Sequence, residues 1–175
     1  NNGQMIAEVA ANNRANDIFK AIGLHDTGRS APEITSKARN LKHNSAAIYG
    51  HFRDAKRLDG EKLEGNISIF WFDHGWIWFI PLADGTTSVG ATCWPGYLKT
   101  RDKPLKEFFL DTLALAPPLM ERLRDATLVD DAAHATGNYS YSASQATGSR
   151  WLMVGDAFAF VDPVFSSGVY LAMES

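Results

Sequence analysis

The sequence closes with GDAFAFVDPVFSSGVYLAMES (Gly155–Ser175), which directly follows the apolar run WLMV (Trp151–Val154). A short apolar run of this kind is typical of a buried strand. We therefore expect Gly155 and Asp156 at the carboxyl end of a strand, where open α/β sheets bind their ligands. The residues VYLAMES predict a helix that starts after Ser166-Ser167-Gly168.

Several residues of this segment suit a ligand site. Gly155 allows the backbone to approach a ligand closely, and the Asp156 carboxylate can accept hydrogen bonds from sugar or sugar-alcohol hydroxyls. Pro163 favours an extended backbone at Asp162. The start of the expected helix offers free N–H groups to an anion or a polarised oxygen. The structural alternative is a strand, a turn and a helix capped by serine.

Upstream of this segment, apolar runs alternate with turn residues. Strands are expected over 45–52, 65–72, 75–81, 86–93 and within 139–144. Asp84-Gly85 is a strong hairpin signal. Helices are expected over 4–22, 104–116 and 117–126, with Pro104 suited to a first turn. The pattern predicts a mostly antiparallel β-sheet with a helical insertion, an α+β organisation.

One strand of this sheet, GWIWFIP, is unusually aromatic. Trp76 and Trp78 are two residues apart, so both side chains point to one face of the strand, and Ile77 and Phe79 point to the other. Six of the ten residues from Phe70 to Phe79 are aromatic, which predicts a large apolar wall. Aromatic residues favour strands in general, so a packed sheet core is the alternative.

The overall composition excludes several classes of protein. The net charge of −3 gives no basic surface for nucleic acid. Cys93 is the single cysteine, so neither an intrachain disulfide nor a cysteine-based metal site is expected. The histidines show no metal-ligand pattern, and no metal is expected. No apolar run approaches a membrane span, and no signal peptide is visible, so we expect a cytoplasmic setting and no membrane partner.

The string GDAFAFVDPVFSSGV resembles the second FAD fingerprint of flavin-dependent halogenases and their monooxygenase relatives, which share the p-hydroxybenzoate hydroxylase fold. The resemblance implies FAD as cofactor. It implies that Gly155 and Asp156 contact the ribityl chain and that the segment from Asp162-Pro163 to Gly168 lines the flavin ring. In halogenases a halide lies on two successive backbone amides of this loop, here Ser167 and Gly168.

A second motif narrows the resemblance to the halogenases themselves. Trp76, Trp78, Ile80 and Pro81 form Trp-x-Trp-x-Ile-Pro, which resembles the signature that separates flavin halogenases of the tryptophan type from ordinary flavin monooxygenases. These four residues are the candidate catalytic set. The resemblance implies that the tryptophans separate the flavin from the substrate and block direct oxygen transfer.

The resemblance covers about residues 26–175. HDTGRS resembles the Asp-x-x-Gly-Arg corner near the FAD, through Asp26, Gly28 and Arg29. Residues 43–52 and 136–144 also look like family segments. No Gly-x-Gly-x-x-Gly occurs, and no lysine matches the catalytic lysine of the family. We therefore expect a partial segment of a larger enzyme, inactive by itself, that binds FAD weakly or not at all.

These observations together predict a fragment of the p-hydroxybenzoate-hydroxylase-like fold, with a C-terminal strand-helix piece of the α/β FAD-binding layer. The expected parts are a helical lead over 1–25, a substrate-side β-sheet domain over 26–150 with helices near 104–126, and the FAD-layer piece over 151–175.

The function expected is that of an FADH2-dependent halogenase segment that chlorinates or brominates an electron-rich aromatic substrate. Its partners would be halide and a separate flavin reductase. One alternative is a flavin-dependent monooxygenase or oxidoreductase of the same superfamily. The other is an inactive β-rich binding or dimerisation module, in which exposed aromatic surface drives homodimer formation.

Overall fold

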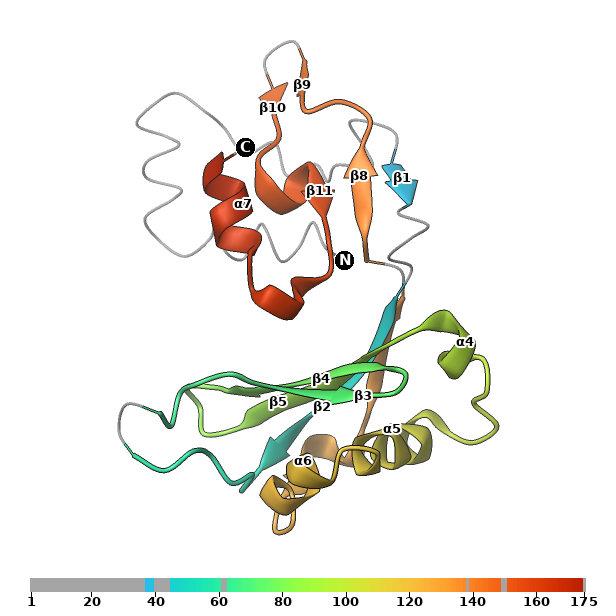
Figure 1. Ribbon diagram of the computed structural model, residues 1–175, viewed down its shortest axis with the longest axis vertical. Helices are drawn as coiled ribbons and strands as arrows, with labels where there is room; N and C mark the ends of the chain where they lie inside the picture. The colour runs from blue at the N-terminus through green and yellow to red at the C-terminus, as the bar shows by residue number, and fades with distance from the viewer. Residues whose placement is uncertain (1–36, 40–44, 61–62, 138, 149–150, 175) are drawn as a thin grey trace. The chain divides into compact units, whose positions relative to one another are not determined.

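The computed structural model describes residues 37–39, 45–60, 63–137, 139–148 and 151–174 (Figure 1). The chain divides into two compact units, Ser45–Asn138 and a second formed by Asn1–Asn44 with Tyr139–Ser175. Each unit is described by itself. The helix expected over 4–22 lies outside the described residues. The domain boundaries expected after residues 25 and 150 stay a prediction.

The first unit is built on an antiparallel sheet with the strand order β3-β4-β5-β2-β6, and β7 also pairs with β2 (Figure 1). Its strands are β2 (Ala46–Arg53), β3 (Ser68–Phe72), β4 (Gly75–Pro81), β5 (Thr87–Cys93), β6 (Thr127–Leu128) and β7 (His134–Gly137). The mostly antiparallel sheet predicted from the sequence is confirmed, and β4 has the predicted bounds.

Tight turns set the register of this sheet. Asp73 and His74 form the link between β3 and β4, and Gly75 follows with a φ of 153°. A Cβ at Gly75 would lie 1.9 Å from the backbone oxygen of Thr92, so only glycine fits there. The predicted turn at Asp84 is also present, where the Asp84 carboxylate accepts a hydrogen bond from the backbone N–H of Thr86 at 2.9 Å.

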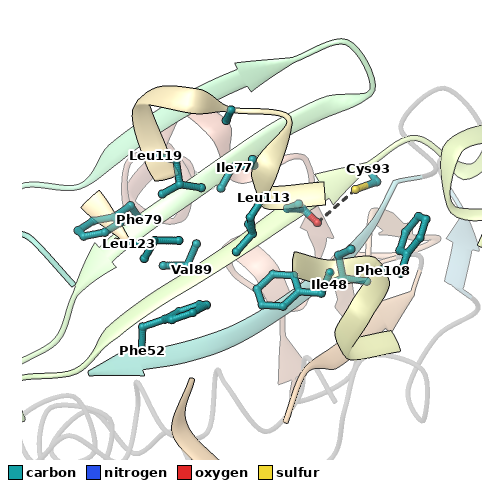
Figure 2. Close-up of a cluster of buried hydrophobic side chains, with 13 residues drawn as sticks. Ile48, Phe52, Ile77, Phe79, Val89, Cys93, Phe108, Leu113, Leu119 and Leu123 are labelled. Atoms are coloured by element: carbon teal, nitrogen blue, oxygen red, sulfur yellow. Dashed lines mark hydrogen bonds between the residues drawn. The ribbon is translucent and has the colours of Figure 1, made fainter. Parts of the chain in front are cut away.

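Helices cover one face of the sheet. These are α5 (Leu105–Ala114) and α6 (Pro117–Arg122), preceded by the short α4 (Pro95–Leu98). The core lies between the sheet and α5 and α6, as Figure 2 shows, and its fully buried side chains include Ile77, Phe79, Val89, Phe109, Leu113 and Leu119. Ile77 and Phe79 therefore face the helices, as the alternation along β4 predicts.

Arg122 fastens the end of α6 to the sheet. Its guanidinium lies 3.7 Å from the ring centroid of Phe79 and donates hydrogen bonds to the backbone oxygen of Lys56 and to Ser68 Oγ, at 2.8 and 2.7 Å. A planar guanidinium can stack and donate at the same time.

The second unit holds a small sheet with the order β1-β8-β11 and a separate hairpin of β9 and β10. Their bounds are β1 (Lys37–Arg39), β8 (Tyr141–Ala143), β9 (Thr147–Gly148), β10 (Trp151–Leu152) and β11 (Ala159–Phe160). Tyr141, Ala143 and Met153 form its buried cluster. The run WLMV was expected to be a buried strand. Only its first two residues are in β10, and Leu152 is 57% exposed while Met153 is 5% exposed.

Short turns connect the remaining elements. They are the 3-10 turns η1 (Val129–Asp131), η2 (Gly155–Ala157) and η3 (Pro163–Phe165), and helix α7 (Gly168–Glu174) closes the described chain. Among the described residues no helix is long and apolar enough to cross a membrane.

Candidate functional site

The glycine of the Gly-Asp pair has a geometric reason to be glycine. Gly155 adopts φ 57°, in the left-handed region, at the start of η2. A Cβ there would lie 2.7 Å from the Cβ of Ala172 and 3.2 Å from its Cα. Gly155 thus allows both the turn and the close packing of α7 against η2.

Asp156 is held at this turn by its backbone. The Tyr141 hydroxyl donates a hydrogen bond to the backbone oxygen of Asp156 at 2.5 Å. The carboxylate is half-buried, and burial raises its pKa above the ordinary value of 3.8. Burial and the nearby Asp156 charge also raise the pKa of Tyr141. Within the described part of the chain, no hydrogen bond reaches the Asp156 carboxylate.

The Asp-Pro segment has the extended backbone that the sequence predicts. Asp162 has φ −62° and ψ 125°, and its carboxylate accepts a hydrogen bond from the backbone N–H of Val164 at 3.1 Å, which caps η3. Ser166 then adopts a left-handed conformation with φ 51°. Asp162 thus begins η3, and the left-handed Ser166 ends it just before α7.

Helix α7 begins at Gly168, and the carbonyl of Ser167 accepts a hydrogen bond from the N–H of Leu171 at 2.9 Å. The predicted helix is present, and it begins at Gly168, one residue before the expected start at Val169. The left-handed residue of this turn is Ser166, so Gly168 is not required for a positive φ. A Cβ at Gly168 would meet only Asp156 Oδ1, at 3.7 Å, which is an ordinary contact.

In the first unit, the tryptophan strand is β4, and it pairs with β3 through Trp71 opposite Trp76 and Ile69 opposite Trp78. The ring centroids of Trp76 and Trp78 lie 5.9 Å apart. The prediction that both side chains share one face of a strand paired with 65–72 is confirmed. Ile80 follows on the same face, and Pro81 ends the strand.

Four residues around Trp78 were missed at the sequence level. Its Nε1–H donates a hydrogen bond to Ser88 Oγ at 3.1 Å, and its ring lies beside Gly90. The ring centroid of Tyr49 lies 6.3 Å from that of Trp78, and the ring centroid of His134 lies 5.5 Å from that of Tyr49. Only the strand pairing brings these residues together, so no local motif could have identified them.

The predicted site residues therefore gather within each unit, at the turn from Gly155 to Gly168 and along β4. Asp26, Gly28 and Arg29 lie outside the described residues. Over the ranges that the structure describes, no cluster of three or more metal-ligating side chains is present.

The family model described as tryptophan halogenase matches residues 61–175. The chain belongs to this family. The flavin-dependent halogenase otaD of Aspergillus carbonarius is 48% identical over 164 residues, which cover 84% of this chain and 32% of otaD. The flavin-dependent halogenase ptaM of Pestalotiopsis fici is 38% identical over 161 residues, which cover 85% of this chain and 30% of ptaM.

Solved halogenase structures agree with this assignment. The myxobacterial chondrochloren halogenase CndH, described as FAD-dependent, matches with a TM-score of 0.73 and 33% identity, over 86% of this chain and 35% of CndH. The flavin-dependent halogenase CmlS matches with a TM-score of 0.70 and 28% identity, over 82% of this chain and 26% of CmlS. The predicted family and fold are confirmed. The chain spans about a third of the length of these halogenases or less.

Proposed function

We propose that this chain forms part of an FADH2-dependent halogenase that chlorinates or brominates an electron-rich aromatic substrate. Its partners would be halide and a separate flavin reductase. The observation that carries the proposal is the turn from Gly155 to Gly168, where a half-buried carboxylate stands beside the start of a helix in a chain of the tryptophan halogenase family.

The residues of this turn fit FAD. The Asp156 carboxylate is held through its backbone and receives no hydrogen bond from the described residues, so it can accept bonds from ribityl hydroxyls. Gly155 would allow the backbone to approach the ribityl chain closely. The segment from Pro163 to Gly168 would line the flavin ring. Reduced FAD supplies the oxygen chemistry by which halide is oxidised.

Halide binding is assigned to the backbone N–H groups of Ser167 and Gly168. Amides at a helix start are fixed in direction, so they stabilise an anion without reorganising. The neighbouring Asp156 carboxylate would oppose an anion by charge repulsion unless it is hydrogen-bonded to the cofactor. We therefore infer that halide binds well only after the cofactor has engaged Asp156.

The side chains of Trp76, Trp78, Ile80 and Pro81 are assigned to the substrate side. Trp76 and Trp78 present rings on the sheet face opposite α5 and α6, and a wall of this kind excludes water from a reactive oxidant. Their role is to bind and orient an aromatic ring and to keep it apart from the flavin.

A graft tests the proposal. This chain would replace the matched 164 residues of otaD, and the product would be assayed by mass spectrometry with FAD, a flavin reductase, oxygen, chloride or bromide, and the substrate of otaD. Halogenated product, at a rate within tenfold of unmodified otaD, supports the proposal. A graft that folds and binds FAD but only oxygenates the substrate would favour the monooxygenase alternative.

Two substitutions in the graft separate the two assigned sites. Asp156→Ala should weaken FAD binding first, measured by titration. Gly168→Ala should lower halogenation and raise the halide concentration needed, with FAD binding retained. Because a Cβ at Gly168 meets only an ordinary contact within the chain, a defect would report on the bound groups. Full halogenation by Gly168→Ala would show that the halide site is misplaced.

A further inference from the structure

One row of residues crosses five strands of the sheet. Strand pairing places them opposite one another in the order Ile69, Trp78, Gly90, Tyr49 and His134, from β3 through β4, β5 and β2 to β7. The row lies on the face away from α5 and α6, because the residues that alternate with it, such as Ile77 and Val89, are buried against those helices.

Gly90 stands between two large aromatic residues in this row. A Cβ at Gly90 would lie 2.2 Å from Cζ2 and 2.5 Å from Cη2 of Trp78, and 2.6 Å from the Cβ of Tyr49. The φ of Gly90 is outside the left-handed region, so the backbone itself accepts any residue. Glycine is required there for space, because the indole of Trp78 lies across β5 where a side chain would otherwise stand.

Ser88 fixes the direction of the same indole. It lies two residues before Gly90 on β5 and accepts the hydrogen bond from Trp78 Nε1 at 3.1 Å. The ring centroid of Trp76, two residues away on β4, lies 5.9 Å from that of Trp78, and the centroid of Tyr49, across β5, lies 6.3 Å from it. The Trp78 indole is thus restrained at two points. Its six-membered ring lies against Gly90, and its nitrogen donates a hydrogen bond to Ser88.

We propose that Gly90 and Ser88 are positioning residues that hold the Trp78 indole across β5. They thereby join Trp76, Trp78, Tyr49 and His134 into one continuous aromatic floor on the sheet face away from α5 and α6. The catalytic meaning of this floor rests on the proposed halogenase function, under which a rigid floor of ring faces and edges suits a planar aromatic substrate.

The direct test is NMR of the indole N–H groups in the 175-residue chain. The five tryptophans give five indole signals, and Trp78→Phe identifies the one from Trp78. The variants are Gly90→Ala, Ser88→Ala and Ser88→Thr. Gly96→Ala is the matched control, since a Cβ at Gly96 meets nothing within 4 Å.

Ser88→Ala should speed solvent exchange of the Trp78 N–H by about fivefold, the factor expected from one lost hydrogen bond. Ser88→Thr, which keeps the hydroxyl, should restore slow exchange. Gly90→Ala should shift the Trp78 signal, and Gly96→Ala should not. If Gly90→Ala unfolds the chain, the two Ser88 variants still test whether the Trp78 indole is held in place. A Trp78 signal and exchange rate unchanged by Ser88→Ala, or equal effects of Gly90→Ala and Gly96→Ala, would overturn the proposal.

The otaD graft tests whether the position of the Trp78 indole affects catalysis. Ser88→Ala should raise KM for the aromatic substrate several-fold, with FAD affinity unchanged, and Ser88→Thr should reverse this. Unchanged KM in an active graft would refute a positioning role in catalysis. If the graft is inactive but the indole signals respond as expected, the proposed function fails while the positioning of Trp78 stands.

Discussion

The Tyr141 hydroxyl and the backbone oxygen of Asp156 are joined by a hydrogen bond of 2.5 Å, which ties strand β8 to the turn η2. Tyr141 is only 4% exposed and also belongs to the buried cluster of the second unit. The residue that carries the candidate cofactor carboxylate is therefore anchored to that cluster.

Tyr141→Phe removes this hydrogen bond and keeps the ring. We expect the free energy of unfolding to fall by about 1 kcal/mol, because a half-buried carbonyl loses its donor. Urea denaturation measures the change, and Tyr170→Phe on α7, where Tyr170 is 60% exposed, is the control. Equal stability of the two variants would contradict the anchoring role.

Gly155→Ala should destabilise the second unit for two reasons, a left-handed φ of 57° and the contact with Ala172. The backbone strain alone costs about 1 kcal/mol. Gly85→Ala is the matched control, since Gly85 has φ 87° and open space around it. The loss in free energy of unfolding should be larger for Gly155→Ala, and Ala172→Gly should recover part of the difference.

Asp156→Asn tests the effect of burial on this carboxylate. Its pKa is raised in the folded chain, so the folded state holds the proton more tightly than the unfolded state does. The charged form therefore costs stability as pH rises above 3.8 and through the folded pKa. Asn removes this cost, so its gain in free energy of unfolding should be larger at about pH 7 than at about pH 3.

Chemical denaturation at both pH values checks this expectation, with the exposed Asp125→Asn as control. A gain that does not depend on pH would show that burial does not affect the ionisation of Asp156. Addition of FAD to a graft that binds it should reverse the sign at neutral pH, because hydrogen bonds from ribityl hydroxyls are stronger to the charged carboxylate of Asp156 than to the neutral amide of Asn.

The sheet was predictable because its signals are local. The alternation along residues 75–81 and the turn residues beside it define β4, and the two-residue spacing places Trp76 and Trp78 on one face. The run at 151–154 was less informative, because an apolar stretch predicts that its residues are buried but not which strand pairs with it. Among the described residues β10 pairs with β9 alone, and Leu152 stays exposed.

The surroundings of Trp78 could not be predicted for a different reason. Gly90 has no side chain, so the sequence alone does not distinguish a glycine needed for space from one needed for a turn. Tyr49 and His134 are remote from Trp78 along the chain and meet it only through the register of β2 with β5 and β7. That register depends on strand pairing, which a single sequence leaves open.

Arg122→Lys should lower the free energy of unfolding by about 2 kcal/mol, because an ammonium cannot stack on Phe79 and reach two acceptors in the same way. Lys56 and Ser68, whose oxygens accept these bonds, connect α6 to β3 and to the segment after β2. Arg124 is exposed and lies two residues further along the chain, so Arg124→Lys should change the free energy of unfolding little. Thermal and urea denaturation of both variants compare the two sites.

Cys93, the single cysteine of the chain, is fully buried beneath the helices, and burial raises its thiol pKa to about 12. In the folded protein it is therefore closed to maleimides and other thiol reagents, which need an exposed thiolate. A cysteine introduced at an exposed position, such as Gly96, would be the only thiol that can be labelled. Fluorophores or spin labels can thus be attached at one chosen point, without first removing Cys93 from the core.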